Sequence, residues 1–323
     1  MQYRTLGRTG LRVSEIGHGM WGMGDWSGAK KNECEQALKL SLENGCNFYD
    51  TAWAYGQGES DKFLGWLVAN QPQKEIVAAS KVPPKNWKWP GSSENKLSEV
   101  YPISYVLETA EIINKCIGKN QIELLQYHVW DDSWANESEF KETVAALKEK
   151  RLIKYFGLSL NRWEPENGIK GIETGVVDTI QVIYNIFDQA PEDKLFPLCE
   201  KMNVGVIARV PLDEGSLGGK MTLQTKFPDS DWRAKYFGSE NLPETIKRVE
   251  AIKNIIPEGI SLPELALRFV LENNTVSTVI VGMRNESHTI NNLNSSIGIR
   301  LPNELYKELR KHRWNREVTP WAN

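Results

Sequence analysis

One strand–helix–strand unit in the middle of the chain decides the fold class. It runs from Ile122 to Leu158 with the sequence IELLQYHVWDDSWANESEFKETVAALKEKRLIKYFGL. The apolar runs Ile122–His128 and Ile153–Leu158 are typical of buried strands. Phe140–Leu147 between them carries apolar residues every three or four positions, as one face of a helix does. A helix between two buried strands predicts a parallel pair joined by a crossover.

The same unit recurs outward over the rest of the chain. Two more helical segments, Cys34–Leu42 and Leu262–Asn273, lie between further strand-like runs. These runs are Ser14–Gly19, Cys46–Asp50, Glu75–Lys81, Val177–Ile183, Val204–Ala208 and Val276–Val281. Strands alternating with helices predict an α/β fold, and eight strands are the number that closes a (β/α)8 TIM barrel, with a doubly wound open sheet as the alternative. No linker-like composition divides residues 1–323, so we expect a single domain.

Three segments outside this repeat have predictable roles. Tyr3–Val13, with a turn at Gly7–Gly10, predicts an N-terminal hairpin before the first barrel strand. The segments after the third strand (Val82–Tyr101) and the seventh strand (Arg209–Asn241) are long loops. Loops that follow barrel strands open on the face where active sites lie, so we expect both to border the site.

Composition excludes several functional classes. The 323 residues contain 39 Lys plus Arg and 42 Asp plus Glu, a net charge of −3, which gives no electrostatic argument for nucleic acid or an anionic membrane. No apolar run approaches the length of a spanning helix, and the N-terminus lacks a secretory signal. The four cysteines are scattered and the histidines do not cluster, so we expect no metal site and a cytoplasmic location.

The segment Gly17–Gly22, GHGMWG, matches G-x-G-x-x-G directly after the first strand, as in a Rossmann dinucleotide-binding turn. That turn requires the third glycine to open a helix against the sheet. Gly22 is followed by polar and glycine residues, and the next helical pattern begins near Asn32. We therefore reject the Rossmann interpretation.

Four polar residues lie at or just after the ends of consecutive strands. They are Asp50, Tyr55, Lys81 and His128. In a barrel these side chains converge on one mouth. A lysine ammonium lowers the pKa of a neighbouring phenol, so we expect Lys81, held by Asp50, to make Tyr55 a usable proton donor, and His128 to orient a substrate carbonyl. This set suits hydride addition to a carbonyl.

Tryptophan gathers on the segments that follow strands. The residues are Trp21, Trp53, Trp87, Trp89, Trp130 and Trp134. Any one of them alone is best explained as core packing. Together, the first five predict an aromatic-lined substrate pocket.

With these residues in place, the chain resembles the aldo-keto reductase family. The resemblance rests on the N-terminal stretch Arg4–Ser14, on Asp50-Thr51-Ala52-x-x-Tyr55-Gly56, on Lys81 after Ala79-Ser80, and on His128. It implies a (β/α)8 barrel that binds NADP(H) without a Rossmann domain, with NAD possible. It also implies that these four polar residues are the catalytic tetrad.

The resemblance further assigns a cofactor cleft. Its residues are Met20, Trp21, Asp50, Ser159, Asn161, Gln181, Arg209, Pro211, Leu212, Gly215, Leu217, Lys220, Gly282, Arg284, His288, Asn291 and Asn292. Ser159 and Gln181 match the carboxamide contacts, with Asn161 one position later than the family's usual Asn. Arg209 stands where many members have an aromatic ring. The segment with Gly215 and Lys220 resembles a loop over the pyrophosphate. Arg284 is expected at a 2′-phosphate.

These observations predict an NADP-dependent carbonyl reductase or alcohol dehydrogenase acting on a small-molecule carbonyl or alcohol. A cofactor-binding regulatory subunit of the potassium-channel beta type is the alternative, since such subunits share this fold and can keep the tetrad. A sugar isomerase would need metal ligands that the strand ends lack. Nothing in the sequence specifies the substrate, the direction of reaction or the oligomeric state.

Overall fold

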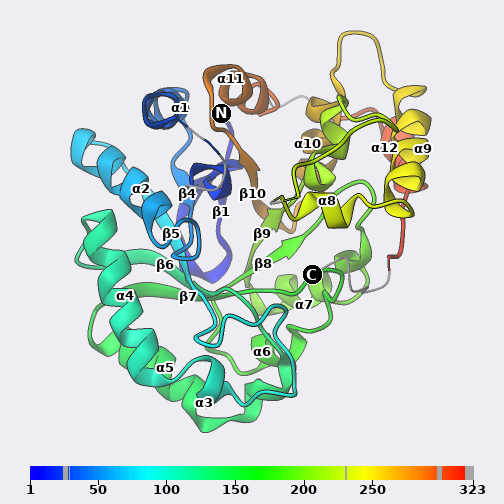
Figure 1. The fold of residues 1–323 in the computed structure, drawn as a ribbon. Coiled ribbons are helices and arrows are strands. Elements are labelled where there is room, and N and C mark those ends of the chain that lie inside the picture. Colours follow the sequence, from blue (N-terminus) through cyan, green and yellow to red (C-terminus); the bar gives the residue numbers. More distant parts are fainter. Residues whose placement is uncertain (25–27, 29, 230, 297–299, 317–323) are drawn as a thin grey trace.

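Eight parallel strands form a closed barrel in the computed structural model, which describes residues 1–24, 28, 30–229, 231–296 and 300–316 (Figure 1). The strands are β3 (Ile16–Gly19), β4 (Phe48–Asp50), β5 (Val77–Val82), β6 (Ile122–Tyr127), β7 (Ile153–Ser159), β8 (Thr179–Ile183), β9 (Gly205–Arg209) and β10 (Val276–Gly282). Each pairs with its neighbour in chain order, and β10 closes the barrel on β3. The prediction of a (β/α)8 barrel is confirmed, and the alternative prediction of an open sheet is wrong.

Helices surround the barrel on the outside (Figure 1). They are α1 (Lys31–Glu43), α2 (Glu59–Asn70), α3 (Leu97–Val100), α4 (Ile103–Ile117), α5 (Ser138–Glu149), α6 (Ile169–Glu173), α7 (Leu195–Met202), α8 (Arg233–Tyr236), α9 (Asn241–Lys253), α10 (Leu262–Glu272), α11 (Glu286–Leu293) and α12 (Asn303–Arg310). Their apolar faces pack on the outward side chains of the strands and form the main hydrophobic core. The described helices include none that is long and apolar enough to cross a membrane.

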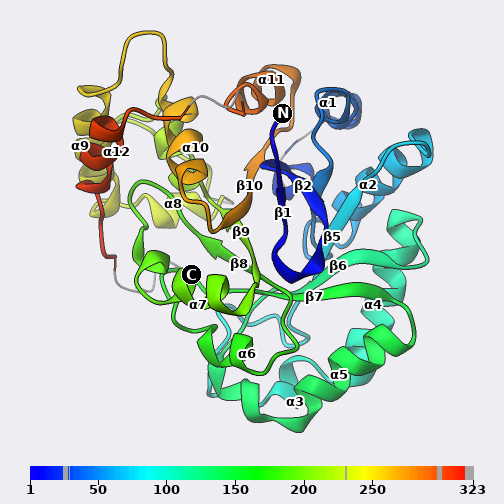
Figure 2. The same ribbon diagram turned by 180° about the vertical axis from the view of Figure 1, so that it is seen from behind.

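The predicted hairpin is present and closes one end of the barrel. Strands β1 (Tyr3–Thr5) and β2 (Arg12–Ser14) pair antiparallel and lie in front of the barrel when it is seen from behind (Figure 2). Leu6 and Val13 of the hairpin join a buried cluster of inward-facing strand residues, such as Phe48. Gly7 has a φ of +49°, and a Cβ there would lie 2.2 Å from the Gly205 nitrogen, so the hairpin turn contacts the start of β9 directly. The opposite end of the barrel is left to carry the site.

Predicted and observed elements agree to within about two residues at each strand end. The helix after β3 begins at Lys31, and Gly22 lies instead in a short 3₁₀ turn, Trp21–Met23, which supports rejecting a Rossmann turn. Both long loops are present but shorter than predicted, because the short helices α3 and α8 lie within the predicted ranges: residues 83–96 lie between β5 and α3, and residues 210–232 between β9 and α8. The structure describes all of the second loop except residue 230.

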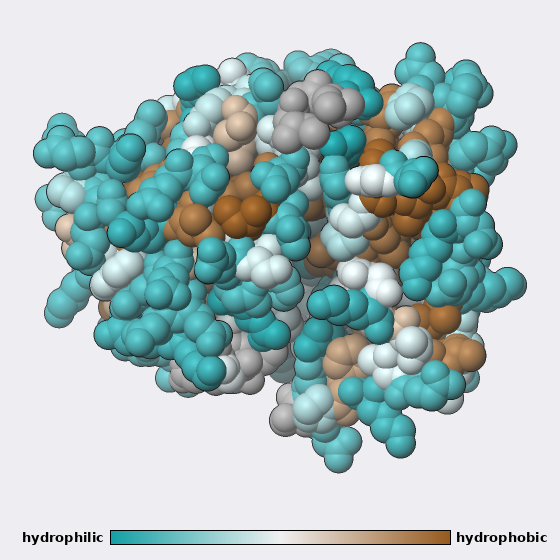
Figure 3. Space-filling view, turned by 90° about the horizontal axis from the view of Figure 1, so that it is seen from above, coloured by the Kyte–Doolittle hydropathy of each residue, from teal (hydrophilic) through white to brown (hydrophobic). Residues whose placement is uncertain are grey.

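The outer surface is mainly hydrophilic. Viewed from above, hydrophobic side chains gather in separate groups among polar ones (Figure 3). This pattern fits a chain with a mean hydropathy of −0.46 whose apolar residues are mostly committed to the core.

Candidate active site

The register of the strands brings the predicted polar residues to one end of the barrel. Phe48 and Ala79 point into the barrel interior, and Asp50 and Lys81 follow each of them by two residues. Because side chains alternate along a strand, Asp50 and Lys81 point into the same interior, one layer nearer its open end.

Asp50 and Lys81 form a buried ion pair at this end. The Lys81 Nζ atom lies 2.5 Å from Asp50 Oδ2 and donates a second hydrogen bond to the Thr51 carbonyl at 2.9 Å. The other carboxylate oxygen, Oδ1, accepts from Gln181 Nε2 at 2.8 Å and Gln126 Nε2 at 3.2 Å. Both members are almost fully buried, so these contacts fix the direction of the ammonium group.

Tyr55 and His128 lie beside this ion pair. The Lys81 ammonium is 5.3 Å from the centre of the Tyr55 ring, whose centre is 5.6 Å from that of His128. Trp89 contacts His128 edge-on, with 4.6 Å between the ring centres. The structure therefore brings all four predicted tetrad residues together and adds one tryptophan of the third-strand loop.

Burial controls the protonation states of these groups. Burial raises the pKa of Tyr55, and the Lys81 charge only partly offsets it, so the phenol is less acidic than an ordinary tyrosine. The expectation that Lys81 makes Tyr55 unusually acidic is therefore wrong in this structure, because desolvation outweighs the ammonium. Burial lowers the pKa of Lys81, but Asp50 and Tyr55 more than compensate and hold it charged. Burial, Lys81 and Arg209 lower the pKa of His128 well below its usual range, so its imidazole is neutral at pH 7.

Several predicted cofactor residues border the tetrad. The Met20 amide donates to the Asp50 carbonyl at 2.9 Å, and Ser159 pairs in register with Gln181. Arg209 ends β9 and donates to the Leu160 carbonyl at 2.9 Å. These residues come from strands on both sides of the tetrad.

Asn161 has a different use. Its side chain accepts from the Gly91 amide at 3.1 Å and donates to the Gly91 carbonyl at 2.9 Å and to Glu164 at 2.9 Å. The amide therefore ties the loop after β7 to the loop after β5. Three of the four hydrogen bonds that this side chain can make go to the protein, including both of its donors, which does not favour the carboxamide contact assigned to it.

A second part of the predicted cleft carries positive charge at the start of α11. Burial lowers the pKa of His288, and the nearby charges of Arg284 and of Lys220, from the loop after β9, lower it further. The Arg284 Cδ atom lies 3.6 Å from the place of a Cβ on Gly22. All three charged or titratable side chains are exposed, and Asn285 caps the helix by accepting from the His288 amide. Two cations and a helix N-terminus suit a phosphate.

The remaining predicted cleft residues extend between these two regions. Pro211, Leu212, Gly215 and Leu217 lie in the loop after β9, and Gly282 ends β10. Asn291 is exposed on α11, whereas Asn292 is buried and donates to the Gly282 carbonyl at 3.2 Å.

Two buried polar atoms beside the tetrad are left for a bound cofactor or substrate. His128 Nδ1 and Arg209 Nε are both buried without a hydrogen-bond partner. Burial and the charge of Arg162 lower the pKa of Arg209 to about 10, so Arg209 remains a cation at pH 7. Unpaired buried donors and acceptors are costly unless a ligand satisfies them.

The predicted tryptophans divide into two groups. Trp21, Trp87 and Trp89 are more than one-third exposed, and the Trp53 ring packs on the backbone of Gly58. Trp130 is fully buried and contacts Trp134 and Phe140 in the outer core, so it is a packing residue and we remove it from the predicted pocket.

The sequence profile of the Aldo/keto reductase family matches residues 15–313. The chain belongs to this family. Members are oxidoreductases that use nicotinamide cofactors and act on small-molecule carbonyl compounds. In the described residues, no group of three or more His, Cys, Asp or Glu could hold a metal ion.

Individual relatives differ in what their names state. The "NADH-specific methylglyoxal reductase" of Escherichia coli is 26% identical over 86% of this chain and 88% of its own length. A "probable voltage-gated potassium channel subunit beta" of Arabidopsis thaliana is 26% identical over 91% and 90%. The holo form of the aldo-keto reductase AKR11C1 from Bacillus halodurans has a TM-score of 0.76 and 22% identity over the full length of both chains, which shows a common fold.

Three features of the site escaped prediction. Gln126 donates a hydrogen bond to Asp50. It lies on β6 two residues before His128, and because side chains alternate along a strand, this spacing could have predicted that Gln126 points into the barrel. Asp61 lies behind the tetrad, buried against Ser80. The ion pairs that hold the loop after β9 join residues more than 50 positions apart and have no local sequence signal.

Proposed function

We propose that this chain is an NAD(P)H-dependent oxidoreductase that reduces an aldehyde or ketone to the alcohol, with Tyr55 as the general acid. The observation that carries the proposal is the convergence of Tyr55, Lys81, Asp50 and His128 at one end of the barrel, with Lys81 held by two hydrogen bonds. The reaction class follows from the family, and the proposed role of each of these four residues is inferred from its contacts.

The nicotinamide, when bound, supplies a hydride to the carbonyl carbon. The electron pair of the C=O π bond moves to the oxygen, which takes the Tyr55 hydroxyl proton. Lys81 stabilises the phenolate left behind, and Asp50 holds Lys81 charged and oriented. Neutral His128 hydrogen-bonds the carbonyl oxygen and fixes its angle. Because the pKa of Tyr55 is above its ordinary value, the donor is protonated at neutral pH and is lost only as pH rises through that value.

We assign the cofactor preference to NADP(H) on the cations at the start of α11. Arg284, with Lys220 and the helix N-terminus nearby, offers a 2′-phosphate more positive charge than an NADH-specific site needs. Arg284→Ala should therefore raise KM for NADPH at least about tenfold more than KM for NADH, as loss of a charge-assisted pair predicts. Steady-state kinetics with both cofactors measures this, and equal changes would remove the assignment.

The exposed tryptophans favour a flat or ring-shaped substrate. Trp21, Trp87 and Trp89 present aromatic faces at 37%, 51% and 41% exposure, and Trp89 also contacts His128. Aromatic side chains with exposed faces bind sugars and aromatic rings well. We therefore infer that a sugar or an aromatic carbonyl compound is the substrate. The four free cysteines, three of them buried, suit the reducing cytoplasm in which we place the protein.

A regulatory subunit is the second candidate, favoured by the likeness to a probable potassium-channel beta subunit. Steady-state turnover by the purified chain with a panel of aldehydes and ketones separates the two. An enzyme consumes NADPH with at least one panel member at a kcat on the order of 1 s⁻¹ or more. Tight cofactor binding with negligible turnover on every compound would favour the sensor and contradict the proposed reaction.

A further inference from the structure

The loop after β9 has an unusual backbone. Val210, Asp213 and Glu214 have φ angles of +56°, +44° and +56°, in the left-handed region. That region is unfavourable for residues with a Cβ, and most of all for a β-branched residue such as Val210. Such conformations persist only when the surroundings hold them. Contacts from outside the loop must therefore fix its shape.

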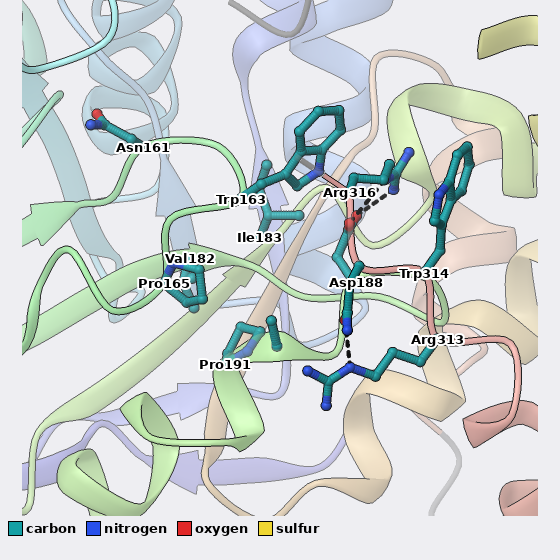
Figure 4. Close-up of a pocket in the computed structure, with 12 residues that line it drawn as sticks. Asn161, Trp163, Pro165, Val182, Ile183, Asp188, Pro191, Arg313, Trp314 and Arg316 are labelled. Atoms are coloured by element: carbon teal, nitrogen blue, oxygen red, sulfur yellow. Dashed lines mark hydrogen bonds and ion pairs between the residues drawn. The ribbon is translucent and has the colours of Figure 1, made fainter. Parts of the chain in front are cut away.

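Arg316, at the end of the described C-terminal segment, makes one of these contacts. Its Nη2 atom donates to Asp213 Oδ1 at 2.6 Å and to Asp188 Oδ2 at 2.6 Å, and its Nε atom donates to Asp188 Oδ1 at 3.1 Å. The Nη1 atom donates to the Tyr236 hydroxyl at 2.8 Å. Figure 4 shows the two contacts between Arg316 and Asp188 beside a cavity of about 100 Å³. The guanidinium thus joins the segment after β8 to the loop after β9.

This clasp (Arg316, Asp188 and Asp213) is buried and enclosed by aromatic rings. The side chains of its three members are 2%, 7% and 1% exposed. The centres of the Trp163 and Trp314 rings lie 4.9 and 4.7 Å from the guanidinium carbon. Buried, multiply bonded guanidinium–carboxylate contacts are rigid, and losing one partner leaves an uncompensated charge.

Further hydrogen bonds connect the clasp to the start of the strained segment, at Val210, and to its later turn, at Ser216. Asn185 Nδ2 donates to Asp188 Oδ2 at 2.8 Å and to the Val210 carbonyl at 3.0 Å. Asp213 Oδ2 accepts from the Ser216 hydroxyl at 2.7 Å, within the next turn of the loop. Arg316 is therefore connected to residue 210 through Asp188 and to residue 216 through Asp213.

We propose that Arg316 is a positioning residue for cofactor binding: by joining Asp188 to Asp213 it holds residues 210–219 in the shape that receives the dinucleotide. The proposal rests on the proposed function and on the family resemblance, which assigns the segment with Gly215 and Lys220 to a loop over the pyrophosphate. Arg316 touches neither the tetrad nor the cations at α11, so its effect passes through the loop. It makes the C-terminal segment a determinant of cofactor affinity.

Arg316→Gln tests the proposal against Arg313→Gln as a matched control. Arg313 lies on the same segment, but its ion pair with Asp193 is partly exposed and does not contact the loop. The measurement is the Kd of NADPH and of NADH by fluorescence titration of the purified full chain. We expect Arg316→Gln to raise both Kd values about 5- to 150-fold, the range of typical site-to-site coupling, and Arg313→Gln to leave them within about twofold.

Two further readouts separate positioning from a general loss of structure. At saturating cofactor, the kcat of Arg316→Gln should stay within about threefold of wild type, since the tetrad is untouched. Arg316→Lys keeps the charge without the forked contacts and should restore part of the affinity. If Arg316→Gln does not fold, Asp188→Asn takes its place, with an expected rise in Kd of at least about fivefold.

The outcomes are distinct. A wild-type chain that binds neither NADPH nor NADH contradicts the proposed function. A wild-type chain that binds cofactor, with Arg316→Gln or its substitute Asp188→Asn binding equally well, overturns the positioning role while leaving the proposed function in place. A fall in kcat at unchanged Kd also overturns it.

Discussion

The two halves of the barrel mouth are held in different ways. On the side of β4 to β6, the reacting groups lie on strand ends or just after them, and the ladder and the Asp50–Lys81 ion pair fix them. On the side of β7 to β9, the predicted cofactor loop depends on side-chain contacts between loops, namely Arg162–Glu214 and the Arg316 clasp. Under the proposed roles, the reacting groups lie on the rigid strand frame, whereas cofactor affinity depends on side-chain contacts that single substitutions can remove.

Lys81→Met should give the largest effect and tests the strand-end half. It removes the ammonium that stabilises the Tyr55 phenolate, so we expect kcat to fall about 10³-fold, within the range of lost acid–base catalysis. Steady-state turnover at saturating cofactor measures this. The cofactor Kd should stay within about threefold of wild type.

A control is needed because Lys81→Met leaves the buried Asp50 carboxylate unpaired. The double variant Asp50→Asn/Lys81→Met removes both charges and should recover much of the melting temperature without recovering turnover. Turnover within about tenfold of wild type in the folded single variant would show that the strand-end half does not carry the chemistry.

Glu214→Gln tests the loop half and should have an intermediate effect. Glu214 Oε1 accepts from Arg162 Nη2 at 2.5 Å, with both side chains largely buried. Losing this charged contact should loosen the loop and raise the cofactor Kd about 3- to 10-fold, with kcat nearly unchanged. Fluorescence titration and saturating kinetics together decide the matter. A fall in kcat at constant Kd would mean that the loop half affects the reaction itself and not cofactor affinity.

Asp61→Asn should have the smallest effect on turnover and a clear effect on stability. Asp61 is buried behind the strand ends, accepts from Ser80 at 2.8 Å, and burial raises its pKa to about 7. The unfolded chain ionises this group near pH 4, so the folded state loses stability as pH rises from 4 to 7, by about 4 kcal/mol at most. The Asn variant should lack this loss.

Denaturant unfolding of wild type and Asp61→Asn at pH 5 and pH 8 measures the difference. The advantage of the variant should be larger at pH 8 than at pH 5. An equal difference at both values would show that Asp61 does not titrate in this range.

The strand-end half could be predicted from the sequence because its signals are local. Apolar runs mark the strands, and a polar residue at the end of such a run, such as Asp50 or Lys81, marks the mouth. Alternation along the strand fixes which way it points. The family motif then gave each residue an expected role.

The loop half could not be predicted because its contacts are set by tertiary packing. Asn161 pairs with Gly91, 70 residues away, and Arg316 pairs with Asp188 and Asp213 at separations of 128 and 103. The predicted direction of the Tyr55 pKa shift is wrong for the same reason, because that direction depends on burial, which no local pattern encodes. Trp130 likewise follows a strand, as a rim residue would, and only its packing against Phe140 shows that it belongs to the core.

In the proposed reaction, everything depends on Tyr55 donating the proton beside a bound nicotinamide. Single-turnover oxidation of NADPH by Tyr55→Phe, with the cofactor Kd measured on the same sample, tests it most directly. We expect a hydride-transfer rate at least about 10³-fold below wild type with the Kd unchanged within about twofold. A rate within about tenfold of wild type would contradict it.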